Sequence, residues 1–228
     1  MKVLLLIVFL TISTMAQIEG NPENWCRDGF FTRDSKDFTT ATIEAGKTKR
    51  AYFHSDEKED CPKSAGCRTK TYLVEGDVVV VNRKRDRFAC AWYTPPKGSP
   101  TVGWIETSDL HFGEMLVDVS PEAWAGEWTF GKSSIEFTPA AEKGFLNVTG
   151  NATWEGIGAN VHVGEIEGTY SPKDGLIEYS EGNDEYDCRM TMRLLGTHLI
   201  VADNLQCGGV NVTFSGVYKK TPKRRKAR

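Results

Sequence analysis

Apolar and polar side chains alternate in short stretches along most of this chain, and turn residues separate the stretches. Residues 70–81 show the pattern most fully, because apolar positions lead into Gly76-Asp77 and a β-branched run follows. This pattern indicates a strand, a tight turn and a second strand. Similar stretches follow along the chain, and Gly103-Trp104-Ile105 belongs to the last of them in the first half. Together they predict a small β-barrel in the first half of the chain.

The second half has the same alternation at closer spacing. A single helical turn is expected at residues 121–124, with Ser120 as N-cap and Pro121 at the first position. Nine strand candidates follow, at residues 124–130, 134–138, 144–148, 151–154, 161–166, 176–179, 188–195, 198–203 and 210–218. Such a meander suits a small antiparallel barrel or a sandwich, so the whole chain is predicted to be all-β.

The N-terminus has the pattern of a secretory signal peptide. Met1-Lys2 precedes an apolar run that is too short to span a bilayer, and Thr14 and Ala16 supply the small residues of a cleavage site. Cleavage is expected after Ala16, with a later site near Gly20 as the alternative. The mature protein is therefore expected to be secreted or periplasmic and not membrane-spanning.

The predicted organisation has five parts. These are a signal peptide at 1–16, a leader segment at 17–45, a first barrel at 46–112, a second barrel at 120–218 and a basic tail at 219–228.

Six cysteines in the mature part favour disulfides, because an even count behind a signal peptide is typical of an oxidising compartment. A hairpin turning at Gly196-Thr197 brings Cys188 close to Cys207, which predicts the first pair. The other four cysteines allow three pairings. Our interpretation is a local clip and a long-range bond, namely Cys61–Cys67 and Cys26–Cys90.

Charge is distributed unevenly along the chain. The formal net charge is −3, but the tail carries seven basic residues, so residues 17–218 stand near −11 once Lys2 is removed with the signal. An acidic body argues against nucleic acid and favours basic partners. The tail is interpreted as a solvated, disordered end, with contact to an anionic lipid or wall polymer as the alternative.

The first half resembles a bacterial SH3-type domain, the SH3b class, over about residues 46–112. The resemblance rests on five motifs in order: Ala51-Tyr52-Phe53, residues 72–78, Phe88-Ala89, Gly103-Trp104-Ile105 and Ser108-Asp109-Leu110. It implies a barrel of five or six strands that holds peptidoglycan or a protein ligand. The long insert between His54 and Lys70 departs from the family pattern.

Two resemblances concern the second half. Gly126-Glu127-Trp128 after a helical turn resembles the start of lipocalin-like barrels, which implies a calycin-like fold. Residues 203–218 resemble the endings of uncharacterised secreted bacterial β-barrel proteins, and this implies no function.

Candidate binding residues fall in two places. Tyr52, Trp92 and Trp104 are expected to line a ligand groove on the first barrel, with core packing as the alternative for each. Asp203 and Asn204, beside the Cys188–Cys207 pair, are expected to form a partner loop, with a simple turn as the alternative.

The sequence contains no catalytic signature. Each cysteine has a disulfide mate and the four histidines are scattered, so no catalytic residue, metal site or cofactor is predicted. The leading hypothesis is a non-catalytic secreted or periplasmic protein that recognises a cell-envelope component, either peptidoglycan or an envelope protein. The alternative is an inhibitor or immunity protein against a basic hydrolase such as a lysozyme or amidase.

Overall fold

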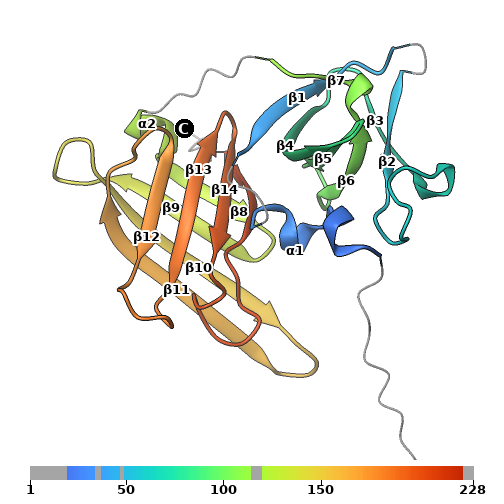
Figure 1. The fold of residues 1–228 in the computed structure, drawn as a ribbon. Coiled ribbons are helices and arrows are strands. Elements are labelled where there is room, and N and C mark those ends of the chain that lie inside the picture. The colour runs from blue at the N-terminus through green and yellow to red at the C-terminus, as the bar shows by residue number, and fades with distance from the viewer. Residues whose placement is uncertain (1–19, 34–36, 47–48, 114–119, 223–228) are drawn as a thin grey trace, which may run out of the picture.

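The computed structural model describes residues 20–33, 37–46, 49–113 and 120–222. The predicted signal peptide and residues 223–228 of the predicted tail lie outside these ranges. Within them, two antiparallel sheets form a half-barrel and a nearly closed barrel, which confirms the predicted all-β fold class (Figure 1). No helix in the described part of the chain is long and apolar enough to cross a membrane.

The N-terminal barrel is a seven-stranded sheet in the order β3-β2-β6-β5-β4-β1-β7. Its strands are β1 (Thr39–Ile43), β2 (Arg50–His54), β3 (Arg68–Val74), β4 (Val78–Arg85), β5 (Phe88–Tyr93), β6 (Thr101–Glu106) and β7 (Leu110–His111). Two short helices precede it, η1 (Pro22–Asn24) and α1 (Asp28–Phe31). Two further 3-10 turns lie inside it, η3 (Ala65–Cys67) and η4 (Thr107–Asp109).

The C-terminal barrel is an eight-stranded sheet in the order β11-β10-β9-β8-β15-β14-β13-β12. It follows α2 (Pro121–Trp124). Its strands are β8 (Gly126–Phe130), β9 (Ser133–Pro139), β10 (Leu146–Glu155), β11 (Val161–Tyr170), β12 (Leu176–Ser180), β13 (Arg189–Leu195), β14 (His198–Asp203) and β15 (Gly216–Lys220).

The strand predictions are wrong in three places. Residues 39–43, assigned to the leader, form β1, which pairs with both β4 and β7. The two candidates at 144–148 and 151–154 are one strand, because Gly150 continues the ladder opposite Ile166. The last strand is β15, which begins only at Gly216 and includes Lys219 and Lys220, so these two lysines are not part of a solvated tail.

All three predicted disulfides are confirmed. The bonded pairs are Cys26–Cys90, Cys61–Cys67 and Cys188–Cys207, with S–S distances between 2.01 and 2.10 Å. The first joins the N-terminal segment to β5, the second closes the long polar loop, and the third ties the loop after β14 to the residue before β13. They are compatible with an extracellular location.

Each barrel has its own interior, and a third apolar cluster joins the two barrels. Ala89 and Ala91 of β5 face the interior of the N-terminal barrel, whereas Phe88, Cys90 and Trp92 face outward into the third cluster. From the C-terminal barrel, this cluster takes the outward-facing side chains Leu195, Ile200 and Val217, with Phe130 packed against it. Strand β5 is therefore buried on both faces.

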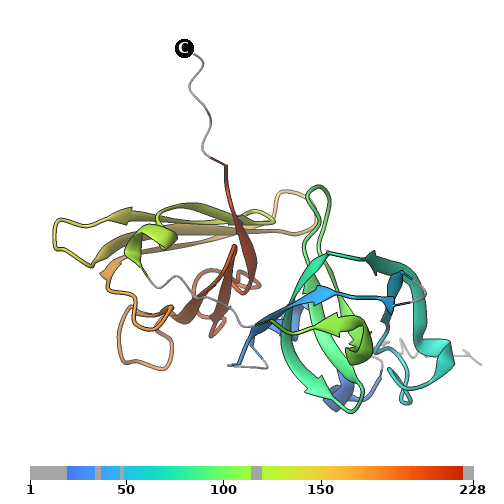
Figure 2. The same ribbon diagram turned by 90° about the horizontal axis from the view of Figure 1, so that it is seen from above.

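The N-terminal segment lies between the two barrels (Figures 1 and 2). Helix α1 contacts both β6 and β15, and Phe31 belongs to the shared cluster. The ring centroid of Trp92 lies 5.3 Å from that of Phe31 and 5.5 Å from that of Phe130. Lys219 reinforces the junction, because its Nζ donates to the carbonyls of Thr94 and Pro95 at 2.5 and 2.9 Å.

Replacing Trp92 with alanine is expected to lower the free energy of unfolding by about 3–5 kcal/mol, because it removes a buried indole that contacts both barrels. Chemical denaturation followed by fluorescence and circular dichroism measures the loss. Val78→Ala, at an exposed position of β4, is the control and should cost less than about 1 kcal/mol. Equal losses in the two variants would contradict the proposed junction.

Candidate functional site: the exposed surfaces of the two barrels

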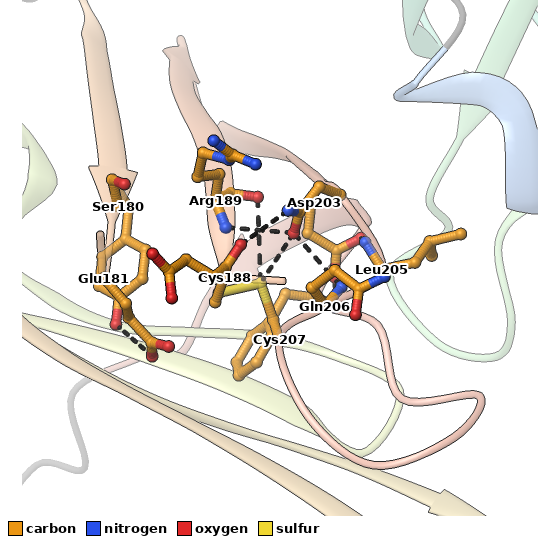
Figure 3. Close-up of a disulfide and its surroundings, with 12 residues drawn as sticks. Ser180, Glu181, Cys188, Arg189, Asp203, Leu205, Gln206 and Cys207 are labelled. Atoms are coloured by element: carbon orange, nitrogen blue, oxygen red, sulfur yellow. Dashed lines mark hydrogen bonds between the residues drawn. A yellow bond between two sulfur atoms is a disulfide. The ribbon is translucent and has the colours of Figure 1, made fainter. Parts of the chain in front are cut away.

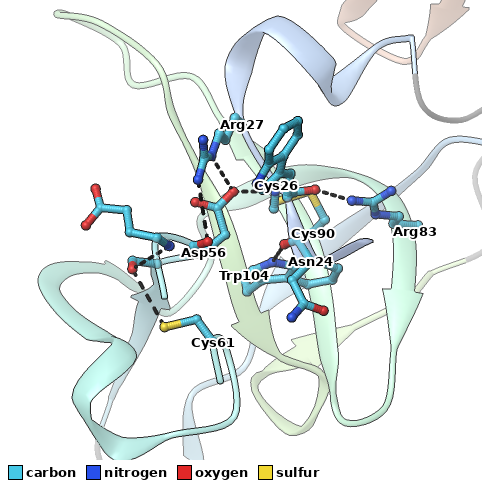
Figure 4. Close-up of polar contacts among 11 residues, drawn as sticks. Asn24, Cys26, Arg27, Asp56, Cys61, Arg83, Cys90 and Trp104 are labelled. Carbon is cyan, nitrogen blue, oxygen red and sulfur yellow. Dashed lines mark hydrogen bonds and ion pairs between the residues drawn. A yellow bond between two sulfur atoms is a disulfide. The ribbon is translucent and has the colours of Figure 1, made fainter. Parts of the chain in front are cut away.

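Two of the three residues predicted to line a groove on the N-terminal barrel are buried. Trp92 is 1% exposed and Trp104 is fully buried, so neither indole is available to a ligand. The C-terminal barrel covers Trp92. The N-terminal segment covers Trp104, and the indole Nε1 of Trp104 donates to the carbonyl of Asn24 at 2.6 Å (Figure 4).

Asp56 holds the N-terminal segment in this position. Its Oδ2 accepts from the backbone N–H of Cys26 at 2.7 Å and from Nε of Arg27 at 2.8 Å (Figure 4). Arg83 donates to the carbonyl of Trp25 from the other side. The segment is thus bonded across the surface where a ligand was expected.

Tyr52, the third predicted groove residue, remains at the surface. It pairs with Tyr72 across β2 and β3, with ring centroids 5.6 Å apart. The guanidinium of Arg68 lies 3.6 Å from the centroid of the Tyr52 ring, and that of Arg50 lies 4.4 Å from the Tyr72 ring. A hydrogen bond from Arg50, and to a smaller extent one from Arg68, lowers the pKa of the Tyr52 phenol. We call these four residues the arginine–tyrosine ladder.

Asp203 and Asn204 shape the predicted partner loop rather than face a partner. Asp203 is buried, and its carboxylate accepts from the Thr213 and Ser215 hydroxyls at 2.8 Å each and from the Phe214 N–H at 2.6 Å. The side chain of Asn204 bonds the neighbouring strand, accepting from the Arg189 N–H at 3.1 Å. Both residues are therefore positioning residues for the loop.

One side chain that the loop presents outward is Leu205 (Figure 3). Its backbone φ is 63°, a conformation that residues with a bulky side chain rarely adopt. Its side chain is exposed although it is apolar. The disulfide at Cys207 and the bonds of Asp203 hold the loop in this form. Sequence patterns of Asx and Gly residues identify such a turn, but they do not tell which side chain faces solvent.

The outer face of β8–β11 carries a row of carboxylates that the sequence analysis did not single out. Glu127 lies opposite Glu136, Glu136 opposite Thr149, and Thr149 opposite Glu167. Glu165 lies on the same face of β11, two residues before Glu167. All four glutamates are exposed, and no ion pair joins them to a basic side chain in the described ranges. We call this surface the acidic face.

The acidic face contains an open groove of about 600 Å³. The four glutamates line it, together with Tyr179 and Glu181 from the other end of the sheet. The hydroxyl of Tyr179 donates to Oε1 of Glu181 at 3.0 Å. Burial raises the pKa of the Tyr179 phenol, so this hydroxyl stays protonated.

The C-terminal barrel, which carries this face, accounts for most of the acidity of the protein. Residues 121–218 contain fourteen acidic and five basic residues, which gives −9 of the −11 of residues 17–218. Like charges directly opposite one another on a sheet are unfavourable, so the Glu127–Glu136 pair costs stability in the isolated protein.

One group has metal-ligand spacing in the described part of the chain. Asp60, Cys61 and Cys67 offer ligand atoms within 4.8 Å of one another, but the two sulfur atoms are bonded to each other. The group is therefore the end of a disulfide-closed loop.

Comparison with protein-family models, with curated proteins and with solved structures finds no match to this chain.

Substituting Asp203 with alanine is expected to lower the free energy of unfolding by about 3 kcal/mol, because the hydroxyls and the N–H that it accepts from are left unpaired. Thermal or denaturant unfolding measures the effect. Asp203→Asn, which keeps one acceptor oxygen, should lose less. Glu178→Ala, at an exposed position of β12, is the control, and a loss no larger than the control's would show that Asp203 does not organise the loop.

Proposed function

We propose that this protein is a non-catalytic secreted or periplasmic binding protein whose C-terminal barrel binds a basic protein. The partner class that fits best is a cationic hydrolase such as a lysozyme or amidase, which the protein would inhibit. The observation that carries the proposal is the acidic face, a row of exposed carboxylates that no ion pair joins to a basic side chain in the described ranges.

Electrostatics supports a basic partner in two ways. A surface with one sign of charge attracts an oppositely charged protein over distance and raises the association rate. Pairing with lysine or arginine side chains would also relieve the repulsion between Glu127 and Glu136, which lie opposite each other. The benefit exists only in the complex, so the row is more easily explained by binding than by stability.

The fixed loops of the C-terminal barrel favour an inhibitor. The Cys188–Cys207 bond and the carboxylate of Asp203 order the loop after β14 before any partner arrives. A partner therefore binds without a large cost for ordering the loop. Inhibition of an enzyme then needs only that the bound barrel cover the active-site cleft.

Incubation with a cationic lysozyme and, separately, a cationic amidase tests this proposal. We expect binding and loss of activity with at least one of them at about 0.1 M salt. Binding should weaken strongly at about 1 M salt, where the Debye length falls from about 10 Å to about 3 Å. Calorimetry and a turbidity assay measure the two effects.

The double variant Glu136→Gln/Glu167→Gln should bind about tenfold more weakly, mainly through slower association. Glu57→Gln/Glu75→Gln on the N-terminal barrel changes the net charge equally and serves as the matched control. Equal effects in the two double variants would show that only net charge matters and not the acidic face.

A second candidate function concerns the N-terminal barrel, which we propose to be of the SH3b type. The arginine–tyrosine ladder supports recognition of an anionic cell-envelope polymer. Two guanidinium groups stacked on phenol rings are held in fixed orientations, and guanidinium donors match carboxylate and phosphate groups. Strand β3 lies at the edge of its sheet, so the ladder is accessible from outside the barrel.

Sedimentation with purified sacculi that retain their anionic polymers tests the second candidate. Arg50→Gln/Arg68→Gln should reduce the fraction of protein that pellets by about half or more, since two phosphate- or carboxylate-binding groups are lost. Lys97→Gln/Lys143→Gln removes the same charge at exposed positions elsewhere. If the ladder variant pellets like this control, the ladder does not bind the polymer.

A further inference from the structure

A second groove lies beside α2, where the chain leaves the C-terminal barrel. It has a volume of about 1070 Å³ and is lined by apolar side chains such as Pro139 and Phe145 and by the exposed carboxylate of Glu122. We call it the end groove. Glu127 and Glu136 line both the end groove and the groove of the acidic face, so the two grooves meet at this pair.

The last described residues of the chain lie in the end groove. The N–H of Thr221 donates to the carbonyl of Glu127 at 2.7 Å, and Nζ of Lys220 donates to the carbonyl of Ala123 at 2.8 Å. Pro222 also lines the groove, and because proline has no N–H it cannot extend the pairing with β8. The pairing thus carries the chain to Glu127, at one end of the row of carboxylates.

The residues that follow Pro222 are strongly basic. Residues 223–228 lie outside the described ranges, and we call them the basic segment. They contain no acidic side chain and five basic ones, namely Lys223, Arg224, Arg225, Lys226 and Arg228. The basic segment is therefore attached directly beside a surface of opposite charge.

The basic segment is long enough to cross the whole row. Three strand steps lead from Glu127 through Glu136 and Thr149 to Glu167, which is about 14 Å at about 4.8 Å for each step. Six extended residues span about 20 Å. The segment can therefore reach Glu167 while Thr221 keeps its bond to β8.

The chemistry of the two grooves suits lysine and arginine. Their aliphatic stems pack on apolar side chains such as Phe145, while their charged ends pair with carboxylates. Attachment to β15 gives the segment an effective concentration in about the millimolar range at this surface. Individually weak charge pairs are then sufficient to keep the surface occupied.

We propose that the basic segment lies across the end groove and the acidic face and competes there with a basic protein partner. The contact itself involves only this chain, whereas its effect on a partner rests on the function proposed above. A partner with several lysine or arginine side chains displaces the segment, and a weakly basic protein does not. The segment therefore makes the acidic face more selective.

Neutralising the basic segment tests the contact without any partner. The neutral-segment variant combines Lys223→Gln, Arg224→Gln, Arg225→Gln, Lys226→Gln and Arg228→Gln. In amide NMR spectra of the full mature chain at low salt, the signals of Glu136, Thr149 and Glu167 should differ between this variant and the natural protein. The differences should vanish at about 1 M salt, where the Debye length is about 3 Å.

The matched control removes the same number of charges from exposed positions of the N-terminal barrel. It combines Lys49→Gln, Lys58→Gln, Lys70→Gln, Arg87→Gln and Lys97→Gln. This control should leave the signals of the acidic face unchanged.

The effect on a partner is measured by calorimetry with the cationic lysozyme and amidase. The neutral-segment variant should bind about tenfold more tightly than the natural protein, because a tethered competitor is lost. The control variant should change the affinity by less than about threefold, since it alters only the net charge.

The outcomes distinguish the contact, the competition and the proposed function. If neutralising the segment shifts no signal of the acidic face, the contact is wrong. If the shifts occur but neither form binds the enzymes, the contact stands and the proposed function fails. If the natural protein binds and the neutral-segment variant binds no more tightly than the control, the competition is wrong while the proposed function stands.

Two further results would assign the basic segment to another surface. Shifts that grow with protein concentration over about a tenfold range would show that the segment binds a second copy of the chain. Binding to vesicles of equal parts phosphatidylcholine and phosphatidylglycerol that only the neutral-segment variant loses, with no shift on the acidic face, would show that it binds anionic lipid. Either result overturns the inference.

Discussion

The packing of Trp92 between Phe31 and Phe130 is the contact on which the arrangement of the two barrels depends. It joins a strand of the N-terminal barrel, the N-terminal segment and a strand of the C-terminal barrel in one apolar cluster. The Cys26–Cys90 bond and the Asp56 carboxylate hold the segment there. Because both faces of β5 are buried, the N-terminal barrel has no open groove over this strand.

The junction also determines which surfaces are left for partners. On the C-terminal barrel, it covers the outward-facing apolar residues of β13–β15, represented by Ile200 and Val217. The outer face of β8–β11 remains exposed and is acidic. On the N-terminal barrel the exposed feature is the arginine–tyrosine ladder on β2 and β3. The molecule thus presents a cationic aromatic surface on one barrel and an acidic surface on the other.

Most of the strands and the Cys188–Cys207 bond could be predicted from the sequence, because alternation, turn residues and hairpin geometry are local signals. The pairing of the other four cysteines was a choice among three, since no local signal links Cys26 to Cys90 across 64 residues. The burial of Trp92 and Trp104 could not be predicted, because alternation identifies the two faces of a strand but not what covers the outer face. The acidic face was missed for a related reason. Its glutamates are distant in sequence, and only the strand register places Glu127, Glu136 and Glu167 in one row.

The central claim is that a basic protein binds the C-terminal barrel through the acidic face. Hydrogen–deuterium exchange of the mature chain, with and without a saturating cationic lysozyme or amidase, tests it most directly. Exchange should slow in β9, β10 and β11 and remain unchanged in β2 and β3. Protection confined to the N-terminal barrel, or found in neither barrel, would contradict the claim.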